Sequence, residues 1–340
     1  MSLNPKERLL RVLNGQEVDR PPVICTGGMM NAAIVEVMNR TGNLLPAAHH
    51  EGGLMAALAG DIHQDTGFEN LGIPFCMTVE AEVLGSEINF GTLACEPKIE
   101  RELFPSASQV VYRQIPEMLK SGRISEVIQA GWRVAAQHPD TPVIGNLTGP
   151  ISTAASIIDP VTFLKELRKE PANSHRVLEY VSDLLIAFAG ELINNGVTLI
   201  SIGDPTATGE ILGPKMFEEY AVRYLNRVID GIHGFGAPVI VHICGKLQSV
   251  KHSLPALRAD ALSTDALVNL KLLKEEFPTL TTRGNVSTFM LERGEAEKVA
   301  RHTQVLIRDG INIISPACGL STSSSLETIR AMTDSVKGTA

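Results

Sequence analysis

Residues 238–245 read Pro-Val-Ile-Val-His-Ile-Cys-Gly, a short β-branched run that ends in a turn signal. Similar apolar runs recur along the chain, and longer amphipathic stretches lie between them. Strands that are apolar on both faces are typical of a parallel sheet covered by helices. The alternation therefore predicts an α/β fold, a (β/α)8 barrel. We expect its strands at 22–25, 142–146, 198–203, 238–243, 261–264, 280–283 and 311–315.

The expected helices complete the pattern at 6–13, 124–137, 161–169, 174–195, 214–233, 246–257, 267–277, 296–309 and 325–336. One segment, 76–103, alternates polar and apolar residues and contains turn signals, which indicates a hairpin insertion. The chain has 340 residues, more than the roughly 250 of a plain barrel. We therefore expect one domain over residues 1–340, with an N-terminal extension and this insertion.

Composition excludes several classes of function. The net charge of −8, without a long basic block, argues against a nucleic-acid surface. Residues 1–15 are charged rather than apolar, and no run of eighteen apolar residues exists, so we expect a cytoplasmic protein without a membrane span. Five cysteines in a long chain suit a reducing compartment, where they serve as core residues or metal ligands.

His242, Cys244 and Cys318 form the candidate metal site. His242 and Cys244 are two residues apart, so they point to the same face if the strand continues that far. Cys318 follows the last expected strand, and the carboxyl ends of barrel strands hold the active site. One imidazole and two thiolates favour zinc and leave a fourth position open. Taken singly, such residues are more often core filler.

Asp265 ends the next expected strand and is either a fourth ligand or the cap of a helix that begins near Leu267. Zinc removes the proton from a bound thiol, and two anionic Cys ligands leave electron density on that sulfur. Such a site suits alkyl transfer to sulfur better than activation of water.

Several motifs resemble known families. The opening segments 4–15 and 18–23 resemble the start of the uroporphyrinogen decarboxylase superfamily, which has a (β/α)8 barrel. Further segments are similar to the methylcobamide:coenzyme M methyltransferases of methanogenesis: 27–31, 67–82, 146–150, 241–245 and 316–319. The resemblance implies that His242, Cys244 and Cys318 bind zinc. It also implies that coenzyme M is the thiol substrate and that a corrinoid cofactor (methylcobamide) arrives on a partner protein. The decarboxylase itself lacks this metal set, so porphyrinogen decarboxylation is disfavoured.

Other candidate residues follow from position and resemblance. Glu80 and Glu82 would face the barrel mouth together and bind a corrinoid amide or move a proton, unless they are merely an exposed hairpin pair. Asp204 follows a strand and is a candidate catalytic residue. Candidates for corrinoid binding are Gly27, Gly28, Met29, Met30 and Asn70, with Glu69 beside Asn70; Met packing in the core and a local Asn turn are the ordinary alternatives. Coenzyme M carries a sulfonate, for which Arg20, Lys246 and Arg283 are candidate partners.

Two alternatives stay open at this stage. The first keeps corrinoid chemistry but uses another methyl acceptor, such as tetrahydrofolate or homocysteine. The second makes the zinc a structural clamp in a non-catalytic protein, which normally requires four protein ligands.

Overall fold

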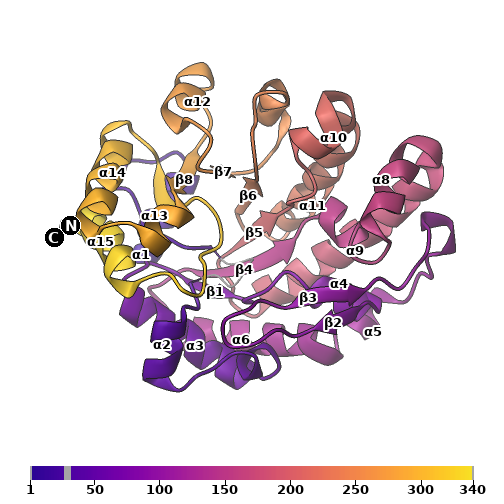
Figure 1. Ribbon diagram of the computed structural model, residues 1–340, viewed down its shortest axis with the longest axis horizontal. Helices are drawn as coiled ribbons and strands as arrows, with labels where there is room; N and C mark the ends of the chain where they lie inside the picture. Colours follow the sequence, from indigo (N-terminus) through magenta and orange to yellow (C-terminus); the bar gives the residue numbers. More distant parts are fainter. Residues whose placement is uncertain (1, 27–31, 339–340) are drawn as a thin grey trace.

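Parallel strands form the centre of the molecule, with helices around them, in a computed structural model that describes residues 2–26 and 32–338 (Figure 1). The larger sheet has seven strands in the order β1-β4-β5-β6-β7-β8-β9, and every neighbouring pair is parallel. The strands are β1 (Leu71–Ile73), β4 (Val143–Thr148), β5 (Leu199–Gly203), β6 (Val239–Ile243), β7 (Ala261–Thr264), β8 (Thr282–Val286) and β9 (Ile313–Pro316).

The segment 22–25 closes the ring between the two edge strands. Val23 forms a parallel bridge with Ile314 of β9, and the Ile24 N–H donates to the Ile314 carbonyl at 3.0 Å. On the other side, just before β1, the Asn70 side chain accepts from the Cys25 N–H at 2.9 Å and donates to its carbonyl at 2.8 Å. Eight parallel segments therefore surround one centre, and the predicted barrel is confirmed.

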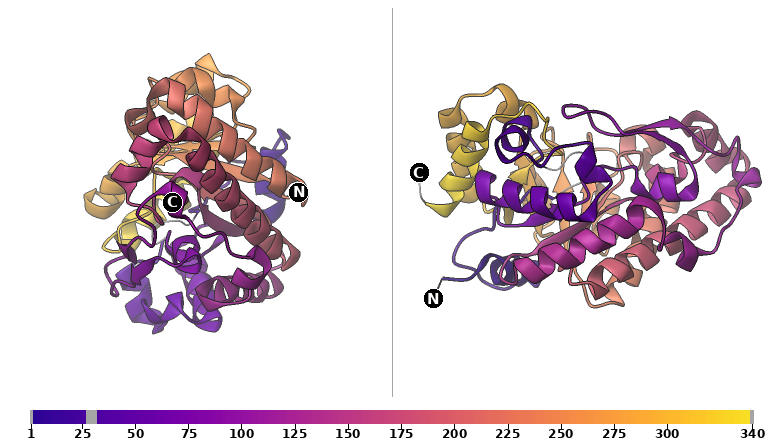
Figure 2. Two further views of the ribbon diagram at one scale, coloured as in Figure 1. Left: turned by 90° about the vertical axis from the view of Figure 1, so that its right-hand side faces the viewer. Right: turned by 90° about the horizontal axis from the view of Figure 1, so that it is seen from below.

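Helices cover the outside of the barrel, as the views in Figure 2 also show. The longer ones are α1 (Pro5–Leu13), α3 (Gly52–Thr66), α6 (Gly122–Gln137), α8 (Pro160–Lys169), α9 (Pro171–Asn194), α11 (Arg223–His233), α14 (Ala296–Arg308) and α15 (Leu326–Lys337). The shorter ones are α2 (Val35–Thr41), η1 (Ala47–His49), α4 (Val79–Leu84), η2 (Ala107–Gln109), α5 (Ile115–Met118), α7 (Pro150–Ala154), α10 (Gly209–Met216), η3 (Phe217–Val222), η4 (Lys251–Ala256), α12 (Leu270–Glu276) and α13 (Thr288–Arg293). Within the described ranges, no helix is both long enough and apolar enough to cross a membrane.

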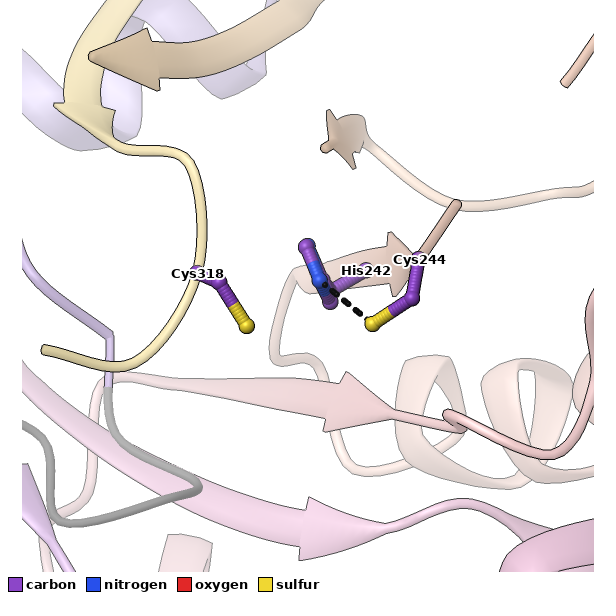
Figure 3. A group of neighbouring side chains, drawn as sticks. All are labelled: His242, Cys244 and Cys318. Carbon is purple, nitrogen blue, oxygen red and sulfur yellow. Dashed lines mark hydrogen bonds between the residues drawn. The ribbon is translucent and has the colours of Figure 1, made fainter. Parts of the chain in front are cut away.

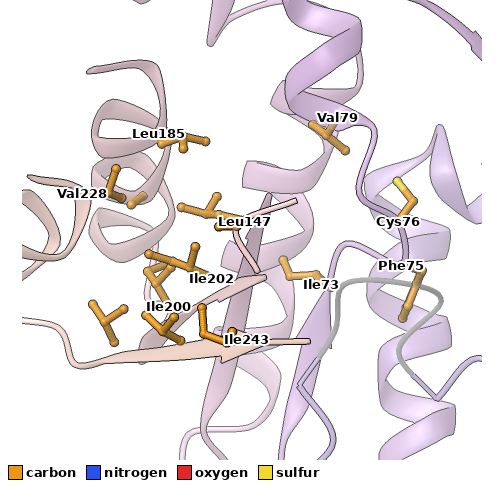
Figure 4. Close-up of a cluster of buried hydrophobic side chains, with 14 of the residues drawn as sticks. Ile73, Phe75, Cys76, Val79, Leu147, Leu185, Ile200, Ile202, Val228 and Ile243 are labelled. Atoms are coloured by element: carbon orange, nitrogen blue, oxygen red, sulfur yellow. The ribbon is translucent and has the colours of Figure 1, made fainter. Parts of the chain in front are cut away.

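The outer core lies between strands and helices. Ile200 and Ile202 of β5 point outward to the layer that contains Leu185 of α9 and Val228 of α11 (Figure 4). All four side chains are fully buried. Burial of a side chain of this size contributes about 1.5–3 kcal/mol, so this layer supplies a large share of the favourable free energy of folding.

The inward face of the barrel is apolar at its amino end. Ile144, Leu199 and Ile240 pack together there with Leu9 and Val12 of α1, which covers that end like a plug. Strand side chains alternate between faces, so the residue two positions further along each strand also points inward, closer to the carboxyl end. Those positions are polar or metal-binding types, and the site is built from them.

The predicted hairpin at 76–103 is only partly correct. Residues 79–84 form helix α4, and the antiparallel pair consists of β2 (Glu87–Asn89) and β3 (Lys98–Arg101) alone. Gly85 ends α4 with a φ of 113°, a conformation that favours glycine. Gly85, which the sequence suggested as a turn residue, therefore ends a helix, because glycine is common both in turns and at helix C-termini.

Other element predictions also need correction. The expected helix at 246–257 is a loop with the short 3-10 helix η4, which contains Pro255. The expected helix at 214–233 is two α-helices, α10 and α11, joined by the π-helical turn η3. α12 begins at Leu270, not Leu267. Strand β1 and helix α3 were not predicted, because β1 has three residues and α3 is rich in Gly and Ala without a clear apolar stripe.

Candidate metal centre and active site

Strand β6 places His242 and Cys244 at the carboxyl end of the barrel. Ile240 belongs to the inward apolar layer, so His242, two residues later, points into the barrel above it. Cys244 lies just beyond the strand. Gly245 follows with a φ of 71°, and a Cβ there would come within 2.5 Å of a Glu210 carboxylate oxygen. The positive φ favours glycine at the turn that carries Cys244.

Cys318 reaches the same point from the loop after β9. The ligand atoms of His242, Cys244 and Cys318 all lie within 4.8 Å of one another, and all three residues are half-buried. The His242 Nε2 and the Cys244 Sγ are 3.1 Å apart, and Figure 3 shows the Cys318 sulfur directed toward them. The structure thus brings together the three residues that the sequence selected as metal ligands.

Ser263 of β7 orients the His242 ring. The Ser263 Oγ lies 2.9 Å from His242 Nδ1, and the two residues are register partners on neighbouring strands. Engaging Nδ1 leaves Nε2 for a metal, and partners of this kind fix the ring of metal-binding histidines. Sequence reasoning missed Ser263, although its inward-facing position in the strand after His242 was a usable signal.

A hydrogen bond between the Cys244 and Cys318 side chains shifts the pKa values of the two thiols in opposite directions. The hydrogen bond with Cys244 and the nearby His242 ring lower the pKa of Cys318 well below its ordinary value. The same hydrogen bond, together with burial, raises the pKa of Cys244. A divalent cation removes this conflict because both sulfurs can then be thiolates.

The residues present fit a zinc ion. One imidazole and two sulfurs are a tetrahedral zinc donor set with one position to spare. Over the described part of the chain, the converging group contains His242, Cys244 and Cys318 but not Asp265. The Asp265 carboxylate instead accepts from the Leu267 N–H at 2.9 Å and faces the Gly245 N–H at 3.4 Å. It caps a turn, whereas Asn269 caps α12, so the predicted helix cap at Asp265 is wrong.

A small pocket of about 50 Å³ opens on the three ligands. Of the three cations considered for a sulfonate, only Arg283 lines it. Arg20 instead forms an ion pair with Glu69, and Lys246 lines a different cavity. The pocket-lining residues are Thr26, Met77, Asn146, Leu147, Ser201, Gly203, Pro205, His242, Cys244, Arg283, Cys318 and Gly319.

Asp204 does not line this pocket. Its fully buried carboxylate accepts from the backbone N–H groups of Ile151 and Ser152 at 3.0 and 2.9 Å and from the Ser152 hydroxyl at 2.6 Å. Burial raises its pKa to about 6 in spite of these bonds. Asp204 thus anchors the start of α7; its catalytic role stays a prediction that these contacts do not support.

Glu80 and Glu82 do not face the mouth as a pair. Both lie on helix α4, where residues two apart point in different directions. Glu80 is buried and accepts from the Thr148 N–H at 2.8 Å and from its hydroxyl at 3.1 Å. Glu82 forms an ion pair with Arg123. The prediction of a paired role is therefore wrong, because it assumed a strand.

The remaining candidates lie elsewhere or outside the described residues. Glu69 forms ion pairs with Arg8 and Arg20 before β1, at the amino end of the barrel, where such contacts serve stability. Both ends of the Asn70 amide bond Cys25, so corrinoid binding by Asn70 stays a prediction without a free group to support it. Gly27, Gly28, Met29 and Met30 lie outside the described residues.

Solved structures share this fold. The chain superposes on a methyltransferase from Methanosarcina mazei with a TM-score of 0.92 and 27% identity, over 99% of both chains. A B12-independent methionine synthase from Shewanella matches with a TM-score of 0.58 and 13% identity, over 94% of this chain and 98% of that one. The second likeness concerns the fold alone.

Sequence relatives extend over nearly the whole chain. The methylcobamide:CoM methyltransferase MtaA of Methanosarcina barkeri is 29% identical over 332 residues, 96% of each chain. The methylcobamide:CoM methyltransferase MtbA of Methanosarcina acetivorans is 29% identical over 338 residues, 98% of this chain and 97% of that one. These matches confirm the resemblance to methylcobamide methyltransferases.

The family model Uroporphyrinogen decarboxylase (URO-D) matches residues 4–339. That match covers the barrel, the plug helix α1 and all three candidate metal ligands. The chain belongs to the uroporphyrinogen decarboxylase (URO-D) family.

Proposed function

We propose that this protein is a zinc-dependent methyltransferase that moves a methyl group from a methylcobamide, delivered on a corrinoid protein, to the thiol of coenzyme M. The convergence of His242, Cys244 and Cys318 beside a pocket at the carboxyl end of the barrel carries the proposal. The printed names of the relatives MtaA and MtbA support the choice of donor and acceptor.

The chain's own residues would prepare the acceptor. His242, Cys244 and Cys318 would hold the zinc, and Ser263 would keep the His242 ring in place. When bound, zinc lowers the pKa of a thiol so that its sulfur is a nucleophile at neutral pH. The sulfur forms the new S–C bond while the cobalt–carbon bond of the methylcobamide breaks. The electron pair of the broken cobalt–carbon bond stays on the cobalt, and the thiol proton goes to solvent.

A second cavity offers the methyl donor an approach. It measures about 360 Å³ and shares Met77 and Pro205 with the site pocket. Lys98 and Ile99 of β3 line it, together with Thr148 at the end of β4. The wider cavity thus lies beside the narrow one at the same mouth, and in-line attack on a methyl group requires such open space.

The test combines metal analysis with a thiol-methylation assay. The purified protein is expected to contain about one zinc per chain and to convert methylcobalamin and coenzyme M to methylated thiol. Removing the zinc with a chelator should abolish the product, and adding zinc should restore it, because the thiol is mostly protonated without the metal. Far-UV circular dichroism checks that the metal-free protein stays folded.

An acceptor panel separates the alternatives. Homocysteine and tetrahydrofolate are assayed beside coenzyme M at equal concentration. Methylation of either one in preference to coenzyme M would replace the proposed acceptor. A zinc-replete protein that methylates none of them, together with X-ray absorption showing four protein ligands, would favour a structural metal site instead.

A further inference from the structure

A buried cation with no carboxylate partner among the described residues lies in the wall of the site pocket. Arg283 is 3% exposed, and its side chain makes no hydrogen bond or ion pair with the described residues. Within residues 2–26 and 32–338, its Nε is buried without a hydrogen-bond partner. Burial of an unpaired charge is costly, so buried cations normally contact carboxylates or ligands. Arg283 therefore has the features of a residue that binds an anionic ligand.

Among the described residues, the surroundings of Arg283 supply no carboxylate. The pocket lining contains no Asp or Glu, and Arg283 is its sole Lys or Arg among the described residues. Cys25 is nearby, but burial raises the pKa of its thiol to about 12, so that it stays neutral at physiological pH. Burial also lowers the pKa of Arg283 to about 10, which still leaves the guanidinium charged. Cys318, the other neighbour, belongs to the metal site.

Arg283 lies two strands away from the metal ligand His242. His242, Ser263 and Arg283 are register partners on the adjacent strands β6, β7 and β8. Two strand spacings separate the backbones of His242 and Arg283, or about 10 Å. A small molecule with its thiol at the metal ligands and an acid group at Arg283 would therefore span only a short distance.

We infer that Arg283 binds the acid group of the thiol acceptor, a sulfonate or a carboxylate held a few atoms from the sulfur. The guanidinium offers several N–H donors in a planar fork that matches such groups. Thr26 and Ser201 line the same pocket with further hydroxyl donors. This inference rests on the proposed function for the identity of the acceptor, and it selects Arg283 over Arg20 and Lys246.

Binding of four ligands to the zinc-loaded protein tests the inference. Calorimetry is performed with 2-mercaptoethanesulfonate, 3-mercaptopropionate, 2-mercaptoethanol and ethanesulfonate. The first two should bind at least about 30-fold more tightly than the neutral 2-mercaptoethanol, because loss of one member of a buried charge pair lowers affinity by that factor. Equal affinity for 2-mercaptoethanol and 2-mercaptoethanesulfonate would overturn the inference.

Variants assign the effect to one residue. Arg283→Met should erase the preference for anionic thiols, Arg283→Lys should keep part of it, and the matched control Lys246→Met should keep all of it. Without ligand, Arg283→Met should melt at the same or a higher temperature, because it removes an unpaired buried charge. A clear loss of stability, or a preference that survives in Arg283→Met, contradicts the inference.

Ethanesulfonate separates this inference from the proposed methyl transfer, since it has no thiol to methylate. It should raise the melting temperature of the wild type and leave that of Arg283→Met unchanged. If this shift is seen but no thiol is methylated, the acid site stands and the proposed function fails. If all thiols are methylated at similar rates regardless of charge, methyl transfer stands and the acid site fails.

Discussion

Single residues in the site owe their chemistry to their neighbours. His242 becomes a defined ligand because Ser263 engages one ring nitrogen and leaves the other free. Glu80, which was expected to act at the mouth, is instead held by Thr148 in a fully buried position. At this scale the decisive quantities are hydrogen-bond partners and burial, and both lead to measurable effects.

The Ser263 hydroxyl should matter for metal binding more than for folding. Ser263→Ala removes the partner of His242 Nδ1, so we expect zinc affinity to fall about 10- to 100-fold. Competition with a chromophoric chelator measures the Kd. Ser125→Ala, at a partly exposed position of α6, is the matched control, with unchanged affinity. An unaltered Kd in Ser263→Ala would show that the ring is oriented by something else.

Glu80 should make the protein less stable as pH rises. Burial raises its pKa to about 7, above an unfolded value of about 4.3. The folded state therefore holds the proton more tightly, and the stabilisation, roughly 4 kcal/mol, is complete below about pH 4 and lost as pH rises through about 7. The pKa of Asp204 is also raised, so Asp204 adds its own pH dependence to the stability. The contribution of Glu80 is therefore measured as a difference between wild type and a Glu80 variant.

Glu80→Gln supplies that difference, because it stays neutral at every pH. Its free energy of unfolding relative to wild type should increase between pH 5 and pH 8, measured by urea unfolding. Asp204 is present in both proteins, so its contribution cancels in the difference between their free energies of unfolding. The exposed Glu117→Gln is the control and should run parallel to wild type. A parallel curve for Glu80→Gln as well would mean that Glu80 is ionised in the folded protein.

Among the elements, helix α7 depends on a carboxylate from another strand end. Three donors at its start bind Asp204, which follows β5. A Cβ at Gly149 would come within 2.4 Å of the Asp204 side chain, so only glycine permits this approach. The contact ties the loop after β4 to the loop after β5 at the mouth of the barrel.

Asp204→Ala distinguishes this anchoring role from the catalytic one. Loss of the buried acceptor should cost about 2–3 kcal/mol of unfolding free energy, while zinc affinity stays near the wild-type value. Urea unfolding and a zinc titration measure the two quantities. The opposite pattern, with full stability and lost methyl transfer, would restore Asp204 as a catalytic residue.

For the whole molecule, the barrel divides stability and function between its two ends. The amino end is closed by α1, whose Leu9 is fully buried against the inward apolar layer. The carboxyl end holds the ligands, the pocket and Arg283. A substitution in α1 should therefore lower the stability of the fold without changing metal binding at the site.

Leu9→Ala tests this separation. The cavity left under the plug should lower the unfolding free energy by about 3 kcal/mol. The neighbouring Leu10→Ala, at a partly exposed position, should cost clearly less. Zinc affinity measured under folding conditions should be unchanged in both. A large change in zinc affinity for Leu9→Ala would show that the two ends are coupled.

The sequence alone determined the barrel and most of its helices, because alternation between apolar runs and amphipathic stretches is a local property. It also placed His242 and Cys244 together, since a two-residue spacing on a strand puts side chains on one face. Cys318 was reachable too, because carboxyl ends of parallel strands meet at one mouth.

Only the tertiary structure decided which polar residues serve the site. Asp204, Glu80 and Glu82 are residue types that often act as catalytic acids or bases, but α7, Thr148 and Arg123 are their partners in the folded protein. Strand register brings Ser263 beside His242 and separates Arg283 from the other candidate cations, Arg20 and Lys246, and the sequence does not state that register. The physical reason is that local periodicity sets the direction of a side chain, whereas its partners depend on residues far away in the sequence.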